Sequence, residues 1–323
     1  MSIETSAARP PFAHHHEVLL LVVLFLVIAL LGVGTNNFLT VGNVLNQGRL
    51  MTEVALVALP MTYIIITGGI DLSVGSIMGL SAIMLGIAWQ SLGLPLELAI
   101  VFAIGIGAIA GFFNGLLIVL LRVPPLIMTL ATLALYRGLA EGISQARSVR
   151  GYPEWFFVMG QGNVLGVPTQ LWILLIAIIA FWIVLARTSF GRSLYAIGAN
   201  EEAARFSGIR VDRVKLIIYS LSGTMAGLAG YIFVSRVSTT RSDMGTGLEL
   251  DAIAAVVLGG TSIFGGVGTI AGTVIGFTLI QLLKNGLALS GVKGDATIVV
   301  IGTVLILSIL VSNFLQRRRG AAG

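Results

Sequence analysis

The sequence contains no cysteine, and only 10% of its 323 residues are charged. Without cysteine the chain can form neither disulfide bonds nor metal sites with thiolate ligands. The charged fraction is less than half of the about 25% usual in soluble domains. Hydrophobic residues make up 56% of the sequence. They occur in runs that approach the roughly 20 residues needed to cross a bilayer as a helix. We therefore predict an integral membrane protein.

Enzyme signatures are also missing from the sequence. It has no His-Glu-x-x-His or Gly-x-Ser-x-Gly pattern and no phosphate-binding loop of the form Gly-x-x-x-x-Gly-Lys-Ser/Thr. The three adjacent histidines at positions 14–16 fit a solvated tail better than a metal site. We expect no catalytic residue, no metal and no cofactor on this chain. If ATP drives its activity, another chain binds the ATP.

Apolar segments predict about ten helices in an all-α, polytopic fold. The predicted spans are 18–33, 52–67, 72–90, 97–121, 125–141, 170–187, 214–235, 248–264, 267–286 and 296–314. The eighth is short and rich in glycine, so the count stays open by one or two. This gives an N-terminal tail (1–17), a single transmembrane domain (18–314) and a C-terminal tail (315–323). The first span lacks a cleavage site and is expected to be retained.

Basic residues set the expected orientation. With the N-terminus inside, eleven of the 19 lysines and arginines fall in cytoplasmic segments and six fall outside. Cytoplasmic loops collect basic residues, so both termini and the polar segment 188–213 are predicted to be cytoplasmic. This orientation explains the net charge of +5 better than nucleic-acid binding does. We expect contact with membrane lipid and none with nucleic acid.

The segment 188–213 contains what reads as a short, well-capped helix. Asn is a favoured N-cap, acids in the first turn suit the helix dipole, and glycine suits the position after the last turn. The helix and its caps are Asn200, Glu201, Glu202, Ala203, Ala204, Arg205, Phe206 and Gly208. Two turns are marginal in water, so the helix needs a packing surface. It either lies on the surface of its own protein or inserts into a cleft of a partner. In the second case the two alanines and Phe206 would form the apolar contact, and the two glutamates would form its charged rim.

Two acids and one amide lie in or near spans. A charge deep in a bilayer is costly and normally faces protein or water. Asp71 and Asp251 either cap helices or stabilise the fold, or they line a solute path. Asn114 either bonds a neighbouring helix or lines that path. An ion-driven carrier would be expected to show more acids within its spans.

A Gly-Gly break interrupts the apolar sequence twice, at Gly68-Gly69 and at Gly259-Gly260, and each break leads through a tight link to a new helix. Paired interrupted helices often mark transporter binding sites. The candidate path residues are Thr67, Gly68, Gly69, Asp71, Ser73, Asn114, Asp251, Gly259 and Gly260.

Three motifs, Gly68-Gly-Ile-Asp-Leu-Ser-Val-Gly75, the segment 197–209 and the segment 250–262, resemble the membrane subunits of bacterial ABC importers of the ribose/xylose/galactose type. The resemblance extends over residues 37–314. It implies a type II importer permease fold in the bacterial inner membrane, moving a monosaccharide or similar polyol by alternating access. Residues 200–208 would then be the coupling helix.

The same resemblance implies three partners: a cytoplasmic ABC ATPase that carries ATP and Mg²⁺, a second permease that is identical or related, and a periplasmic sugar-binding protein. A nucleoside or a branched-chain amino acid is the alternative solute. A stand-alone secondary carrier and a membrane enzyme are the remaining alternatives.

Overall fold

The computed structural model describes residues 12–292 except 36 and 146, together with 294, 296, 299, 302 and 303. The tenth predicted span, 296–314, lies outside the described residues apart from isolated positions, and so does the tail 315–323. The predicted tail 1–17 is described only from residue 12, where a helix begins.

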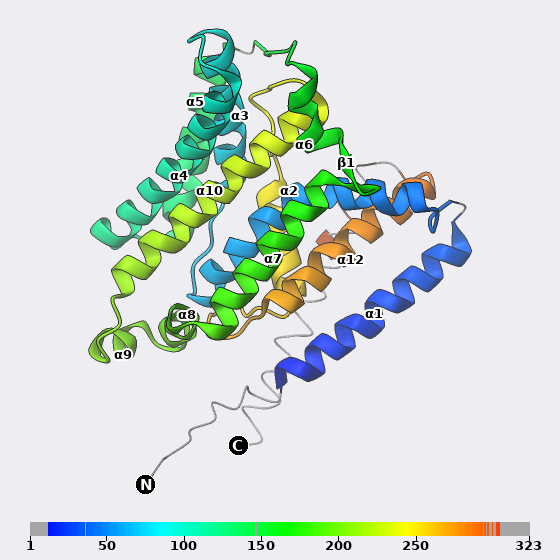
Figure 1. The fold of residues 1–323 in the computed structure, drawn as a ribbon. Helices are drawn as coiled ribbons and strands as arrows, with labels where there is room; N and C mark the ends of the chain where they lie inside the picture. Colours follow the sequence, from blue (N-terminus) through cyan, green and yellow to red (C-terminus); the bar gives the residue numbers. More distant parts are fainter. Residues whose placement is uncertain are drawn as a thin grey trace.

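The described part of the chain is almost entirely helical (Figure 1). The helices are α1 (Phe12–Gly34), α2 (Val41–Ile66), α3 (Val74–Gln90), α4 (Leu96–Leu121), α5 (Pro125–Ser144), α6 (Val158–Gln161), α7 (Thr169–Arg187), α8 (Ser189–Ala199), α9 (Glu201–Phe206), α10 (Val211–Val237), α11 (Leu248–Leu258) and α12 (Ile270–Leu289). A 3-10 turn, η1 (Glu154–Phe157), precedes α6, and the strands β1 (Asn163–Val164) and β2 (Val167–Pro168) form a small antiparallel hairpin. The prediction of an all-α polytopic membrane protein is confirmed.

Among the described residues, seven helices are long and apolar enough to cross a membrane, and α3 is a shorter apolar helix. The predicted eighth span, 248–264, is not one helix. It contains α11, which has 11 residues and at 1.5 Å per residue is about 16 Å long. The hydrocarbon core is about 30 Å thick. Gly260, with a φ of 87°, turns the chain after α11 and ends the helix there.

Helix α2 begins at Val41, well before the predicted start at residue 52. Polar residues hid this first part, because they lower the local hydropathy. In the structure they pair with α12: the side chains of Asn43 and Asn285 exchange hydrogen bonds of 2.8 and 3.1 Å, and Gln281 donates to Gln47 at 2.7 Å. Amides that bond across helices can be accommodated in a lipid-embedded bundle.

Helices α4 and α10 lie side by side (Figure 1). Glycines let their backbones approach closely. A Cβ atom at Gly107 would collide with the Gly223 carbonyl, one at Gly111 with the Tyr219 carbonyl, and one at Gly223 with the Gly107 carbonyl. Lipid tails are as apolar as leucine, so close packing of small residues drives helix association in membranes.

The same packing occurs between α11 and α12. A Cβ atom at Gly272 would meet the Gly259 carbonyl, and one at Gly276 would meet the Ala255 carbonyl. The chain thus contains two units of similar form, α2 followed by the link 67–73 and α3, and α11 followed by the link 259–269 and α12. The backbone N–H of Gly266 donates to the Ile66 carbonyl at 2.8 Å, so the two links meet at one end of the bundle.

Replacing Gly111 by valine is expected to destabilise the folded chain by at least about 1–3 kcal/mol, the cost of overpacking a well-packed core. Gly105→Val is the matched control, because it lies on the same helix with open space around its Cβ position. Thermal unfolding in detergent should show a lower midpoint for Gly111→Val than for Gly105→Val. Equal midpoints would contradict this account of α4–α10 packing.

Candidate functional site

The segment 188–208 forms an arm at the end of the bundle where the two links meet. The arm consists of α8 and α9 (Figure 1). Thr188 caps α8: its hydroxyl oxygen accepts from the Gly191 N–H at 3.2 Å and donates to the Val184 carbonyl at 2.6 Å. Leu194 and Ile197 are buried against the bundle. The first half of the arm is therefore part of the packed core.

Helix α9 has the caps that its sequence predicts. The Asn200 side-chain oxygen accepts from the Ala203 N–H at 2.9 Å, which satisfies an otherwise unpaired donor of the first turn. Gly208 follows the helix with a φ of 85°, a left-handed conformation that costs glycine little. The prediction of a short capped helix within 188–213 is confirmed.

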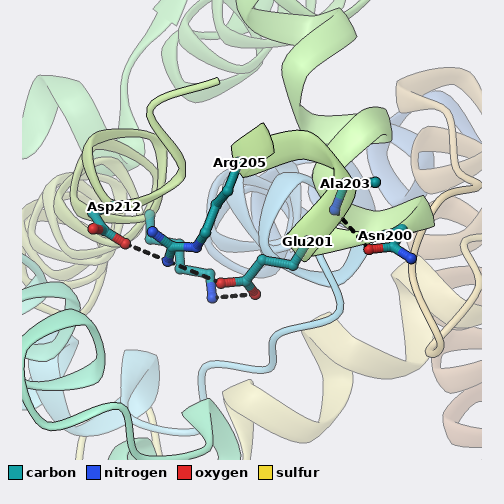
Figure 2. A network of polar contacts seen from close by, with 6 residues as sticks. Asn200, Glu201, Ala203, Arg205 and Asp212 are labelled. Carbon is teal, nitrogen blue, oxygen red and sulfur yellow. Dashed lines mark hydrogen bonds and ion pairs between the residues drawn. The ribbon is translucent and has the colours of Figure 1, made fainter. Parts of the chain in front are cut away.

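Ion pairs hold α9 to the start of α10 (Figure 2). The Arg205 guanidinium contacts the Glu201 carboxylate at 3.1 Å and the Asp212 carboxylate at 2.5 Å. The Lys215 ammonium contacts the other oxygen of Glu201 at 2.7 Å. Glu201 thus joins two cations of its own chain, and α9 is fixed relative to α10 without any partner.

The charged state of Glu201 depends on these contacts. Partial burial acts to raise the pKa of the Glu201 carboxyl, but the hydrogen bond and charge of Lys215, followed by those of Arg205, outweigh it and hold the pKa below its usual value. The hydrogen bond of the Asp212 carboxylate, followed by that of Glu201, raises the pKa of Arg205. Glu201 and Arg205 are therefore both charged at neutral pH.

The predicted partner-facing residues divide into two sets. Ala204 is buried and Glu201 is engaged by Arg205 and Lys215, so both stabilise the arm itself. Glu202 and Ala203 are exposed, and the side chain of Phe206 is 92% exposed. A large aromatic side chain held in solvent on a rigid helix is typical of a contact that a partner covers.

The end of α8 touches both links through backbone atoms. A Cβ atom at Gly198 would collide with the Ile66 carbonyl and with the Gly266 nitrogen. Gly265, with a φ of 88°, lies against the Gly198 backbone on one side and the Gly68 nitrogen on the other. Only glycine allows this approach at Gly198, and the contact joins the arm directly to the end of α2 and to the link 259–269.

A side chain reinforces this contact. The Tyr195 hydroxyl, on α8, donates to the Gly268 carbonyl at 2.7 Å. The link 259–269 is itself a closed turn, because the Ser262 N–H donates to the Val267 carbonyl at 3.0 Å and the Gly265 N–H to the Ser262 carbonyl at 2.9 Å. The Tyr195 hydrogen bond therefore joins the arm to the link that directly precedes α12.

Asp71, Ser73 and Asn114 lie in one buried network. The Asp71 carboxylate accepts from the Ser73 N–H at 3.0 Å, from the Ser73 hydroxyl at 2.6 Å and from the Ser222 hydroxyl at 3.0 Å. Asn114 donates to Ser73 at 2.7 Å and accepts from Tyr136 at 3.0 Å. All three predicted path residues are fully buried. This geometry matches the fold-stabilising alternative for Asp71, because α3 has no side-chain cap hydrogen bond, and the interhelical alternative for Asn114.

The other predicted residues of the first link lie beside this network. The Thr67 hydroxyl donates to the Ile64 carbonyl at 2.8 Å, and Gly68 has a φ of 78°. A Cβ atom at Gly69 would collide with the buried hydroxyl of Tyr219. These positions form a tight turn that ends α2.

The predicted residues of the second link have comparable roles. Gly259 packs against the Gly272 backbone, and Gly260 takes a positive φ. Asp251 lies at the other end of α11, where its carboxylate pairs with the Lys284 ammonium at 2.5 Å. The structure therefore separates Asp251 from the glycines of the link.

One buried ion pair was missed by sequence reasoning. The Glu53 carboxylate on α2 accepts from Arg236 Nε on α10 at 2.8 Å. In the sequence, Glu53 lies at the start of the predicted span 52–67, and Arg236 directly follows the predicted span 214–235. The available clue was Glu53 itself, because an acid within an apolar helix normally has a partner or a function.

Comparison with known proteins identifies the family. The family described as "Branched-chain amino acid transport system / permease component" matches residues 43–309. The chain belongs to this permease family. The match covers both links, the arm and the central helices, and it agrees with a multi-pass membrane transport protein.

Individual relatives of this permease are similar over nearly their whole length. The ribose import permease protein RbsC of Escherichia coli (strain K12) is 41% identical over 297 residues, which cover 89% of this chain and 91% of the relative. RbsC of Bacillus subtilis (strain 168) is 42% identical over 299 residues, or 92% and 91%. The autoinducer 2 import system permease protein LsrD of Yersinia enterocolitica is 36% identical over 310 residues, or 91% and 93%.

Glu201→Gln is expected to loosen the arm, because it removes the charge that holds Arg205 and Lys215. Amide hydrogen exchange across 201–207 should become about twofold to tenfold faster, as expected for the loss of partly exposed ion pairs. Glu202→Gln, which alters an exposed neighbour, is the control and should leave exchange unchanged.

The effect has a defined pH dependence. The pKa of Glu201 is lowered by folding, so the stabilisation is present above the unfolded pKa and is lost as pH falls through the folded pKa. The wild-type and Glu201→Gln chains should therefore become alike in strong acid. A difference that grows on acidification would contradict the assignment.

Proposed function

We propose that this permease is the membrane subunit of an ATP-driven importer of a monosaccharide or similar small polyol. The observation that carries the proposal is the arm: a rigid, exposed helix joined by backbone contact to both interrupted helices of the bundle. The arm is the coupling helix, and a separate ABC ATPase receives it. The similarity to ribose and autoinducer 2 import permeases supports the choice of solute over a nucleoside or a branched-chain amino acid.

The mechanism follows from the contacts of the arm. ATP and Mg²⁺ bind to the ATPase, whose closure displaces Phe206 and the α9 helix. Because Gly198 contacts Ile66 and Gly266, the arm and the two links move as one body. The ends of α2 and α3 and of α11 and α12 then change their tilt, and the solute path closes on one side of the membrane and opens on the other.

The proposed function requires several partner proteins. No step of ATP hydrolysis is assigned to this chain, which transmits movement and forms the path. A second permease, identical or related, completes the path, and a periplasmic sugar-binding protein delivers solute to the end opposite the arm. In this arrangement the arm and both termini are cytoplasmic, and the protein lies in the bacterial inner membrane.

The proposal is distinguished from a stand-alone carrier by the exposed aromatic side chain. Phe206→Asp is expected to abolish ATP-dependent uptake and to reduce capture of the ATPase in a gentle pull-down at least tenfold, the scale of a buried aromatic contact worth about 2 kcal/mol. Leu165→Asp is the matched control, because Leu165 is 89% exposed at the other end of the bundle.

The result is measured in native membranes, with the amount of inserted permease determined for each variant. Uptake that persists in Phe206→Asp would refute the coupling role of α9. Uptake by the reconstituted chain alone, down a gradient and without any ATPase, would favour the stand-alone carrier.

A further inference from the structure

A cavity of about 450 Å³ lies at the end of the bundle opposite the arm. It is formed by the first part of α2, the end of α10, the loop 239–247 and the start of α11. Small-molecule sites commonly have volumes of roughly 300–1,000 Å³. The cavity is therefore large enough for a single small solute.

The charges that line the cavity are balanced in pairs. Glu53 pairs with Arg236 at 2.8 Å, and Asp243 pairs with Arg241 at 2.6 Å. Asp251 pairs with Lys284, which is not itself a lining residue. An ion or a zwitterionic amino acid would have to break one of these pairs to gain a counter-charge. An uncharged molecule with several hydroxyl groups can instead donate to the carboxylates and accept from the guanidinium groups.

The lining also offers a hydroxyl group without a partner. Thr239 Oγ1 is buried and has no hydrogen-bond partner among the described residues. A buried hydroxyl left unpaired is costly, so this atom is poised to bond a ligand. Phe233 adds an aromatic wall, with the Arg236 guanidinium 4.8 Å from its ring centre.

The loop 239–247, which forms one wall of the cavity, is held by hydrogen bonds to residues that are not part of the lining. Arg137 on α5 donates to the carbonyls of Ser242 and Met244. The Thr240 hydroxyl accepts from the Val149 N–H at 2.9 Å, and the Thr240 N–H donates to the Val149 carbonyl at 3.0 Å. The lining is therefore preorganised, which reduces the entropy lost when a ligand binds.

We infer that this cavity is a solute subsite of the permease and that it takes an uncharged polyol. Glu53 and Arg236 bind hydroxyl groups as acceptor and donor, and Thr239 supplies a third polar contact. The inference rests on the proposed function, which it deepens: the end opposite the arm receives the solute, and the charge balance selects a sugar over an amino acid.

Because the chain has no cysteine, Thr239→Cys places a single thiol in the cavity. Native membranes carrying this variant are treated with a membrane-impermeant maleimide, with ribose, xylose, galactose or leucine added separately. At least one of the sugars should slow labelling several-fold as its concentration rises, and leucine should not. Leu165→Cys, exposed at the same end but outside the lining, is the control and should label at one rate throughout.

Thr246→Cys, at an exposed position of the lining, repeats the test if Thr239→Cys does not insert. ATP-dependent uptake by the same membranes is measured in parallel. Labelling that no sugar slows, in membranes that still take up one of these sugars, would overturn the subsite and leave the proposed function standing. Protection by leucine alone, or thiols that are unreactive at both positions, would also overturn the subsite. Absence of both sugar uptake and a bound ATPase would overturn both proposals.

Discussion

The backbone contact at Gly198 is the constraint on which the working of this permease depends. One residue without a side chain lets α8 lie directly on the Ile66 carbonyl and on the Gly266 nitrogen. The hydrogen bond from Gly266 to Ile66 joins the two links to each other as well. Three segments that are far apart in sequence thus share one contact, made by backbone atoms and not by flexible side chains.

Around this contact the bundle uses two kinds of interaction suited to lipid. Glycine pairs bring α4 to α10 and α11 to α12 within backbone contact, and polar side chains inside the bundle are matched with partners. Asp71 and Asn114 bond across α3, α4, α5 and α10, while Asn43 and Gln47 bond α12. Several buried polar atoms of the described residues have no partner, and the Thr239 hydroxyl is the one of these that lines the cavity.

Local signals were sufficient to predict much of this structure. The apolar runs predict the long helices, and Asn200 and Gly208 predict both ends of α9, because caps depend on neighbouring residues alone. The true length of α2 and the shortness of α11 were missed, since polar residues paired across helices and glycine breaks inside apolar sequence both disguise helix ends. Contacts between distant segments, such as Glu53 with Arg236 or Gly198 with Ile66, have no local signature, and the cavity depends on them.

The central claim is that the arm and the two links move as one body. The most direct test is a disulfide between Ala199→Cys and Gly266→Cys. A Cβ at Gly266 would lie 3.5 Å from the Ala199 Cα, so the two Cα atoms are no more than about 5 Å apart, within the reach of a disulfide. The account predicts that the oxidised double variant keeps ATP-dependent uptake, because the bond joins parts that already move together. Uptake that is lost on oxidation and restored by reduction would show that the arm slides against the links, and would contradict the account.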